Sequence, residues 1–275
     1  MFEGLASATP ASGIPGLALG EVMDILLTFL LTMLRIGAFV TAAPLFSARF
    51  MPLQVRLVVA VCLATPLLGT VPLPDPEVLE SARLAVLVLR EIALGLSAGL
   101  LLQILFAVAV VAGDRIANTA GLGLAAQIDP STGTQSPVIG QFFSLFLIAI
   151  FLSVDGHLAA IRLVSESYTL IPIAAPIEGQ ALVAIGTEAA STMFFGAAQI
   201  MMPVVGILLI LNAIIGVITR SAPQLNIFAF GFPLTMSATL LLLFLTTTGT
   251  GFAFAALVED AIARLALLFE AARGG

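Results

Sequence analysis

Few side chains in this sequence could do chemistry, and the most unusual of them are charges inside apolar runs. Arg35 lies midway along one hydrophobic stretch, and Arg90 and Glu91 interrupt another. A charge at the centre of a bilayer costs about 2.5–3.5 kcal/mol, so such side chains normally face protein or water. Two hypotheses stay open: the three residues line or pair within a conduit, or they lie at a membrane edge or outside the hydrocarbon.

Two short patterns resemble enzyme motifs without the surroundings that catalysis needs. Residues 95–99 (GLSAG) fit the G-x-S-x-G nucleophile elbow, which requires a turn between a strand and a helix. Residues 121–126 fit the dinucleotide pattern G-x-G-x-x-A, but no strand precedes them. His157 is interpreted as a helix-end or loop residue, with a proton-relay role as the alternative. We therefore expect no catalytic residues, no cofactor and no metal site.

The composition indicates that these residues lie in a membrane protein. The chain has 275 residues, of which 60% are hydrophobic and 9% charged, whereas soluble domains carry about a quarter charged residues. Every basic residue is an arginine, which excludes chemistry that depends on a lysine ammonium group. The net charge of −6 comes without a basic patch, so nucleic acid is not an expected partner. Membrane lipid and partner subunits are the expected surroundings.

The elements that position these side chains are apolar segments, and a bilayer-spanning helix needs about 20 residues. Six segments approach or exceed this length: 22–46, 57–71, 84–113, 138–154, 189–219 and 221–258. Because backbone groups in hydrocarbon must bond within their own segment, each is expected to be a helix. The predicted fold class is an all-α integral membrane protein, one domain over 1–275 with about six long hydrophobic helices. The expected connectors are 72–83, 114–137, 155–188 and 219–230.

Small and ring-containing residues in these segments predict how the helices pack. Gly95 and Gly99 form a GxxxG pair, which allows two helix backbones to approach closely. Pro203 cannot donate a main-chain hydrogen bond, so a kink or break is expected there. Short connectors that carry arginine tend to stay in the cytoplasm, which places the connector with Arg220 on the inner side.

Five stretches of sequence, taken in order, carry a family resemblance. They are Arg35 followed by TAAPLFSARFMPLQVRL, then REIALGLSAGLLLQ, AGDRIANTAGLGLAAQIDPSTG, LSVDGHL and TRSAPQLNIFAFGFPLT. Together they resemble the flagellar biosynthetic protein FliR family and its virulence-secretion counterparts, across nearly the whole chain. The GFPLT stretch is more similar to the flagellar branch.

The resemblance implies a core subunit of a type III protein export gate in the bacterial inner membrane, at the flagellar basal body. In that family, FliR-like, FliP-like and FliQ-like subunits form a helical assembly with a channel for unfolded flagellar proteins, next to FlhA-like and FlhB-like components. Residues 22–188 would be the FliP-like part, and 189–258 a FliQ-like C-terminal hairpin. A virulence-type injectisome is the alternative. A small-solute transporter is a remoter one, because Pro203 has no counterpart in the first half of the chain.

The resemblance also implies three groups of site residues. The channel plug would be the loop 121–137, including Gly121, Gly123, Ala125, Gln127, Ile128, Asp129, Pro130 and Gly133. Helix packing and assembly would involve Arg35, Arg90, Glu91, Gly95, Gly99 and Pro203. The cytoplasmic tip of the hairpin would hold Arg220, Pro223, Gln224 and Asn226. The plug centre lacks the bulky aromatics that family plugs can carry, and an ordinary polar turn is the alternative for this loop.

Overall fold

The computed structural model describes residues 19–46, 51–72, 83–122, 138–222 and 230–273. All of the regular elements in these ranges are helical, which confirms the predicted all-α class. The α-helices are α1 (Leu19–Ala42), α2 (Leu53–Ala64), α4 (Arg83–Thr119), α6 (Val138–Ser153), α7 (Gly156–Leu170), α8 (Gly179–Ser221) and α9 (Phe232–Ala272). A short 3-10 turn, η1 (Thr65–Leu67), follows α2.

Within the described ranges, the helices that are long and apolar enough to cross a membrane lie in α1, α4, α8 and α9. The predicted segment 57–71 corresponds to α2 and η1, and α2 has only 12 residues, too few for a span. The predicted segment 138–154 is α6, which meets α7 at a bend of 68°; counted as one span, the pair would be a fifth. Asp155, at the bend, has a left-handed backbone with φ of 56°.

The prediction of a connector over 155–188 is wrong, because this stretch holds α7 and the first turns of α8. The buried residues of α7 recur every three or four positions: Gly156, Ala160, Val164, Ser167 and Tyr168. This is the spacing of one helix face. Arg162 and Glu166, which lie on the exposed side of α7, are charged and lower the hydropathy of this stretch. A search for long apolar runs therefore did not detect the buried face of α7.

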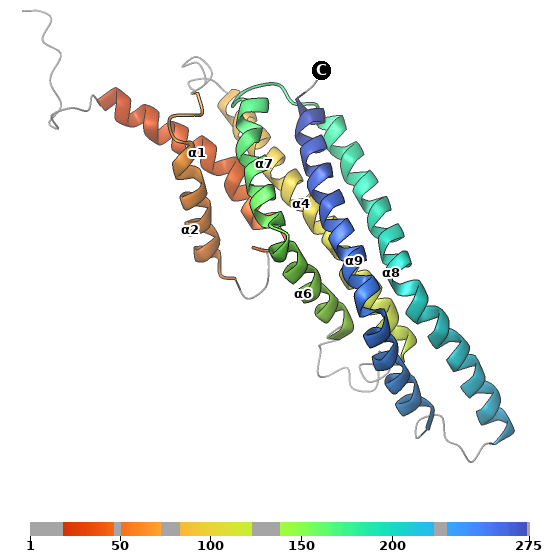
Figure 1. Cartoon of the computed structure of the whole chain (residues 1–275). Helices are drawn as coiled ribbons and strands as arrows, with labels where there is room; N and C mark the ends of the chain where they lie inside the picture. The colour runs from red at the N-terminus through yellow and green to blue at the C-terminus, as the bar shows by residue number, and fades with distance from the viewer. Residues whose placement is uncertain (1–18, 47–50, 73–82, 123–137, 223–229, 274–275) are drawn as a thin grey trace, which may run out of the picture.

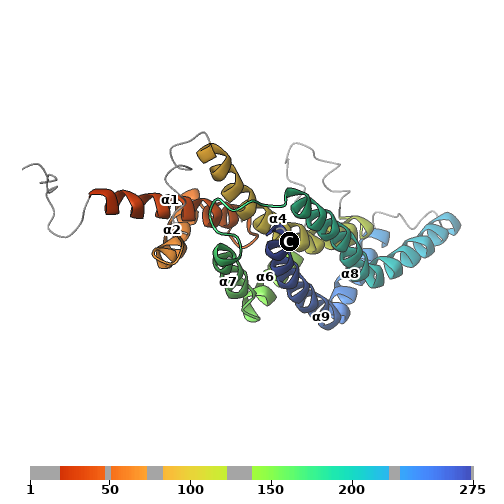
Figure 2. The same ribbon diagram turned by 90° about the horizontal axis from the view of Figure 1, so that it is seen from above.

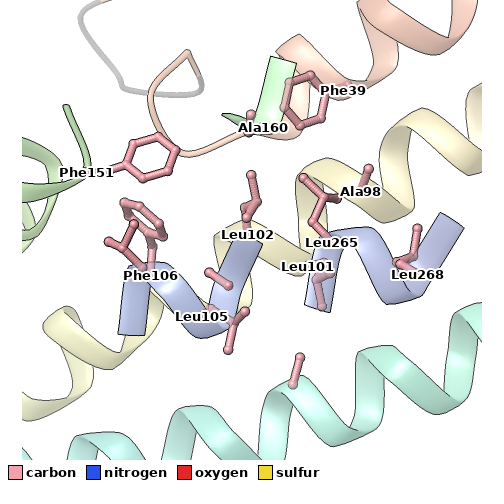
Figure 3. Close-up of a cluster of buried hydrophobic side chains, with 14 of the residues drawn as sticks. Phe39, Ala98, Leu101, Leu102, Leu105, Phe106, Phe151, Ala160, Leu265 and Leu268 are labelled. Atoms are coloured by element: carbon pink, nitrogen blue, oxygen red, sulfur yellow. The ribbon is translucent and has the colours of Figure 1, made fainter. Parts of the chain in front are cut away.

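Helix α4 is the centre of the molecule and contacts α1, α6, α8 and α9. Figure 1 shows α8 and α9 as a long C-terminal hairpin beside α4, with α6 and α7 on the other side of α9. Figure 2 shows α2 lying next to α1, at the end of the molecule away from α8. Figure 3 shows the core between these elements, where Phe39 of α1, Leu101 of α4, Phe151 of α6 and Leu265 of α9 gather.

The hairpin is much less buried than the central helix. In the most apolar stretches of α8 and α9 only 22% of the residues are buried in the structure, against 56% in α4. Large hydrophobic side chains are exposed along both hairpin helices: Phe194, Phe195, Ile210, Leu240, Phe244 and Phe252. An apolar surface of this size is covered by lipid or by another protein.

Candidate functional site

Arg35, a charged residue midway along the first apolar segment, is fully buried and paired. Its side chain has 0% exposure, and Glu91 of α4 has 2%. The Arg35 Nε donates to Glu91 Oε2 at 2.8 Å, and Nη2 donates to Oε1 at 3.0 Å. Two parallel hydrogen bonds of this kind fix both the distance and the relative orientation of the two side chains. The pair therefore sets how α1 lies against α4.

Helix α7 completes the surroundings of this guanidinium. Arg35 Nη1 donates to Ser167 Oγ at 3.0 Å, and Nη2 donates to the main-chain oxygen of Ile171 at 3.0 Å. The guanidinium carbon lies 4.2 Å from the centroid of the Tyr168 ring, a cation–π distance. The Tyr168 hydroxyl in turn donates to the main-chain oxygen of Thr32 at 2.6 Å. One arginine thus connects three helices that are far apart in the sequence.

Of the two hypotheses for these charges, the geometry favours pairing within the protein. Burying a charge is tolerated when it is paired and hydrogen-bonded, and Arg35 meets both conditions. Its four hydrogen bonds leave the charge facing protein, with no need for contact with lipid. The neighbouring Arg90 lies half-buried on α4 and makes none of these contacts. Of the three charged residues that the sequence singled out, Arg35 and Glu91 therefore form a buried pair, and Arg90 lies outside it.

The two glycines of the GxxxG pattern follow Glu91 along α4 and lie where α4 meets α1. A Cβ added to Gly95 would collide with the main-chain oxygen of Arg35, and one added to Gly99 would come within 2.6 Å of the Ala42 Cβ. A third glycine, Gly113, approaches α6 in the same way, because a Cβ there would collide with the backbone of Gly140. Missing side chains thus let α4 touch α1 and α6 backbone to backbone.

The loop 121–137 begins at a defined helix end. Gly121 has φ of 83°, a left-handed value that suits glycine. The Leu122 N–H donates to Ala117 O, and the Gly121 N–H donates to Asn118 O, which together make a Schellman motif at the end of α4. The other candidate plug residues, Gly123, Ala125, Gln127, Ile128, Asp129, Pro130 and Gly133, lie outside the described residues.

The candidate residues of the hairpin lie on α8 and beyond it. Helix α8 is a single helix from Gly179 to Ser221 with Pro203 inside it, so the chain does not break there. Arg220 is exposed in the last turn of α8, where a cation suits the helix dipole. The other tip residues, Pro223, Gln224 and Asn226, lie outside the described residues.

His157 and the other titratable groups form no recognisable reaction centre in the described ranges. His157 is the second residue of α7 and half-buried, with its ring centroid 6.5 Å from that of Phe151. Among the residues that the structure describes, no three His, Cys, Asp or Glu side chains gather as a metal site requires. The hydrogen bonds of buried Arg35 to α4 and α7 can hold α1, α4 and α7 in fixed positions relative to one another.

Sequence reasoning missed the part of this cluster that α7 contributes. Ser167, Tyr168 and Ile171 lie more than 130 positions from Arg35 in the chain, in a stretch that was expected to be a connector. A usable signal was present: Tyr168 is the only tyrosine, and it lies on a face of small and apolar residues spaced every three or four positions.

Comparison with known proteins places the chain in a family. The model for bacterial export proteins, family 1, matches residues 26–261. The flagellar biosynthetic protein FliR of Escherichia coli (strain K12) is 32% identical over 204 residues, which cover 74% of this chain and 77% of that protein. The FliR proteins of Bacillus subtilis (strain 168) and Aquifex aeolicus (strain VF5) are 32% and 31% identical and are covered over 84% and 81% of their lengths. The chain belongs to family 1 of the bacterial export proteins.

Proposed function

We propose that this protein is a core subunit of the flagellar type III export gate. In this role it forms, with FliP-like and FliQ-like subunits, the channel that exports unfolded flagellar proteins across the bacterial inner membrane at the flagellar basal body. The observation that carries the proposal is the family match over 26–261, which includes both the loop 121–137 and the C-terminal hairpin. Relatives named as flagellar proteins favour this system over a virulence-type injectisome.

The physical character of the chain supports a conduit rather than an enzyme. The buried ion pair of Arg35 and Glu91 fixes helix positions, and the described surface of the hairpin is apolar over most of its length. A surface of this kind suits a subunit that packs against other membrane helices. We propose that the protein acts without catalysing a reaction and that FlhA-like and FlhB-like components act beside it.

Within this proposal the two parts of the chain have different tasks. Residues 22–188 would provide the FliP-like part, with the loop 121–137 as a plug that follows the fixed helix end at Gly121. Residues 189–258 lie in the hairpin of α8 and α9, which would pack as the FliQ-like subunits do. The hairpin tip, beyond Arg220, would face the cytoplasm.

Co-purification with the partner subunits tests the proposal. The full chain, with a tag, is expressed together with the FliP-like and FliQ-like proteins of its host, and the purified complex is weighed by native mass spectrometry. A defined hetero-oligomer with one copy of this chain, and loss of motility when the gene is deleted, are the expected results. A monomer or a homo-oligomer, under conditions in which the partners assemble with each other, would contradict the proposal.

A further inference from the structure

Side chains from both helices of the hairpin hold the C-terminal end of α4. The Asn212 Nδ2 of α8 donates to the main-chain oxygen of Thr119, 3.0 Å away. The Thr235 Oγ1 of α9 donates to the main-chain oxygen of Ala120, the next residue, at 3.2 Å. Two consecutive carbonyls at the end of one helix are therefore bound by two other helices, from residues more than 90 positions away in the chain.

The two hairpin donors complete the hydrogen bonding at this helix end. The last carbonyls of an α-helix have no partner within the helix. The Schellman motif binds the main-chain oxygens of Ala117 and Asn118 to amides that follow them in the chain. Among the described residues, the donors to the next two oxygens, those of Thr119 and Ala120, are the two hairpin side chains. The hairpin thus supplies the donors for the oxygens that come after the Schellman motif.

The two contacts differ in strength. The Thr235 hydroxyl also lies 3.0 Å from the main-chain oxygen of Phe232 in its own helix, so its single hydrogen is shared between two acceptors. The side chain of Asn212 has two amide hydrogens, and it lies in the charge-free stretch 189–219 of α8. Because apolar surroundings strengthen a hydrogen bond, we expect Asn212 to be the stronger contact and Thr235 the weaker one.

We propose that Asn212 and Thr235 are positioning residues that make the C-terminal end of α4 part of the hairpin. The first half of α4 is fixed to α1 and α7 through Glu91 and Arg35, whereas its end is fixed to α8 and α9. Separation from the hairpin would leave carbonyls and an amide without partners in apolar surroundings, which opposes independent motion. The end of α4 therefore follows the hairpin when neighbouring subunits pack against the exposed apolar surface of α8 and α9.

Amide hydrogen exchange at Gly121 and Leu122, the donors of the Schellman motif, measures how firmly the end of α4 is held. The purified full chain in detergent is compared with Asn212→Leu, Thr235→Val and the double variant, because Leu and Val keep a similar shape and lose the donor. We expect exchange at these two amides to be at least tenfold faster in the double variant, with most of the effect from Asn212→Leu. Unchanged exchange in the double variant would overturn the inference.

Matched variants separate the lost donors from a general loosening of the hairpin. Thr235→Ser keeps the hydroxyl and should exchange within twofold of the unmodified chain. Gln199→Leu and Thr247→Val change exposed polar residues of α8 and α9, and the Thr247 hydroxyl binds its own helix. Combined, these two substitutions should also leave exchange at the end of α4 within twofold. Equally fast exchange in this control pair and in the double variant would overturn the inference.

Spin labels measure whether the end of α4 and the hairpin move together. Cys62, the only cysteine, is first replaced by Ser, and labels are placed at the exposed positions Asn118 of α4 and Val217 of α8. Electron–electron resonance should give the same narrow distance distribution in the free chain and in the complex with FliP-like and FliQ-like proteins. The distribution should broaden when Asn212→Leu and Thr235→Val are combined. An equally narrow distribution in that double variant would overturn the inference.

Swimming motility tests the positioning role in export, and this arm alone rests on the proposed function. The double variant should assemble in normal yield and melt at a nearly unchanged temperature, while motility falls at least fivefold and the control pair swims normally. Normal motility, or a loss of motility in proportion to lost complex, would overturn the positioning role. Failure of the unmodified chain to co-purify with gate subunits would instead contradict the proposed function, and the exchange measurements would be unaffected by it.

Discussion

The guanidinium of Arg35 caps the end of a helix from another part of the chain: its Nη2 donates to the main-chain oxygen of Ile171, 3.0 Å away, at the C-terminal cap of α7. The last carbonyls of a helix lack partners within the helix, and the dipole there favours a cation. Arg35 therefore supplies a charge and a donor where α7 needs both. The same side chain neutralises Glu91 on α4.

Removing this arginine should be among the most damaging single changes in the chain. Arg35→Ala leaves Glu91 buried without a partner, and breaking a buried pair in this way costs about 3–5 kcal/mol. The double change Arg35→Leu with Glu91→Leu should cost less than Arg35→Ala, because no lone charge remains. Thermal unfolding of the purified protein in detergent measures both. Arg162→Ala, which removes an exposed pair with Glu166, is the control and should leave the melting temperature nearly unchanged.

Substitution of the close-packed glycines should separate α4 from α1. We expect Gly95→Ala or Gly99→Ala to reduce the yield of monodisperse protein severalfold, because the new methyl group meets the backbone of Arg35 or the side chain of Ala42. Gly206→Ala in α8, where nothing lies within 4 Å of the added Cβ, is the control and should behave like the unmodified chain. Size-exclusion chromatography in detergent gives the comparison. Equal yields for all three variants would show that the contact between α1 and α4 adapts.

The hydroxyl and the ring of Tyr168 should make separable contributions. Tyr168→Phe keeps the ring under the guanidinium but removes the hydrogen bond to Thr32 O, a loss of about 1 kcal/mol in unfolding free energy. Tyr168→Leu removes the cation–π contact as well, which should lower stability further by about 1–2 kcal/mol. Denaturation in detergent of both variants and the unmodified protein gives the two differences. A Phe variant as unstable as the Leu variant would mean that the ring contributes little.

Shortening the loop after Gly121 should affect permeability more than assembly. Deletion of residues 125–130 removes chain that the proposed plug needs and leaves the Schellman motif at the end of α4 intact. We expect the complex to form in normal amounts and the membrane to leak ions or small solutes. A deletion of equal length over 74–79 serves as the control. Unchanged dye influx in the plug variant, with normal assembly, would count against the plug assignment.

The sequence was sufficient for the membrane class and for the long helices, because hydrophobic runs and the small share of charged residues are visible without any contacts. It also singled out Arg35 and Glu91, since charges in apolar runs are rare. The sequence could not show that Arg35 and Glu91 contact each other, because they are 56 positions apart and no local rule links them. The same holds for Gly113 and Gly140, which meet as single glycines from two helices, whereas Gly95 and Gly99 have a recognisable spacing within one helix.

The effect of Pro203 on its helix was foreseen only as a kink or a break. Helix α8 continues through Pro203 as one element, which excludes the break. The proline ring lies on an exposed side of the helix, so no neighbouring helix is displaced by it. Proline removes one hydrogen bond and leaves the remaining ones of a 43-residue helix in place.

The length of α8 has a consequence for the thickness of the membrane region. Its charge-free stretch, 189–219, measures roughly 46 Å at about 1.5 Å per residue, whereas the hydrocarbon core of a bilayer is about 30 Å thick. If the helix were not tilted, its apolar stretch would extend beyond the acyl chains by about half of the hydrocarbon thickness. The exposed apolar side chains of this stretch include Phe194 and Phe195 near one end and Ile214 and Val217 near the other. The apolar surface of α8 would therefore extend past the lipid boundary, and neighbouring protein rather than acyl chains would have to cover that part of it.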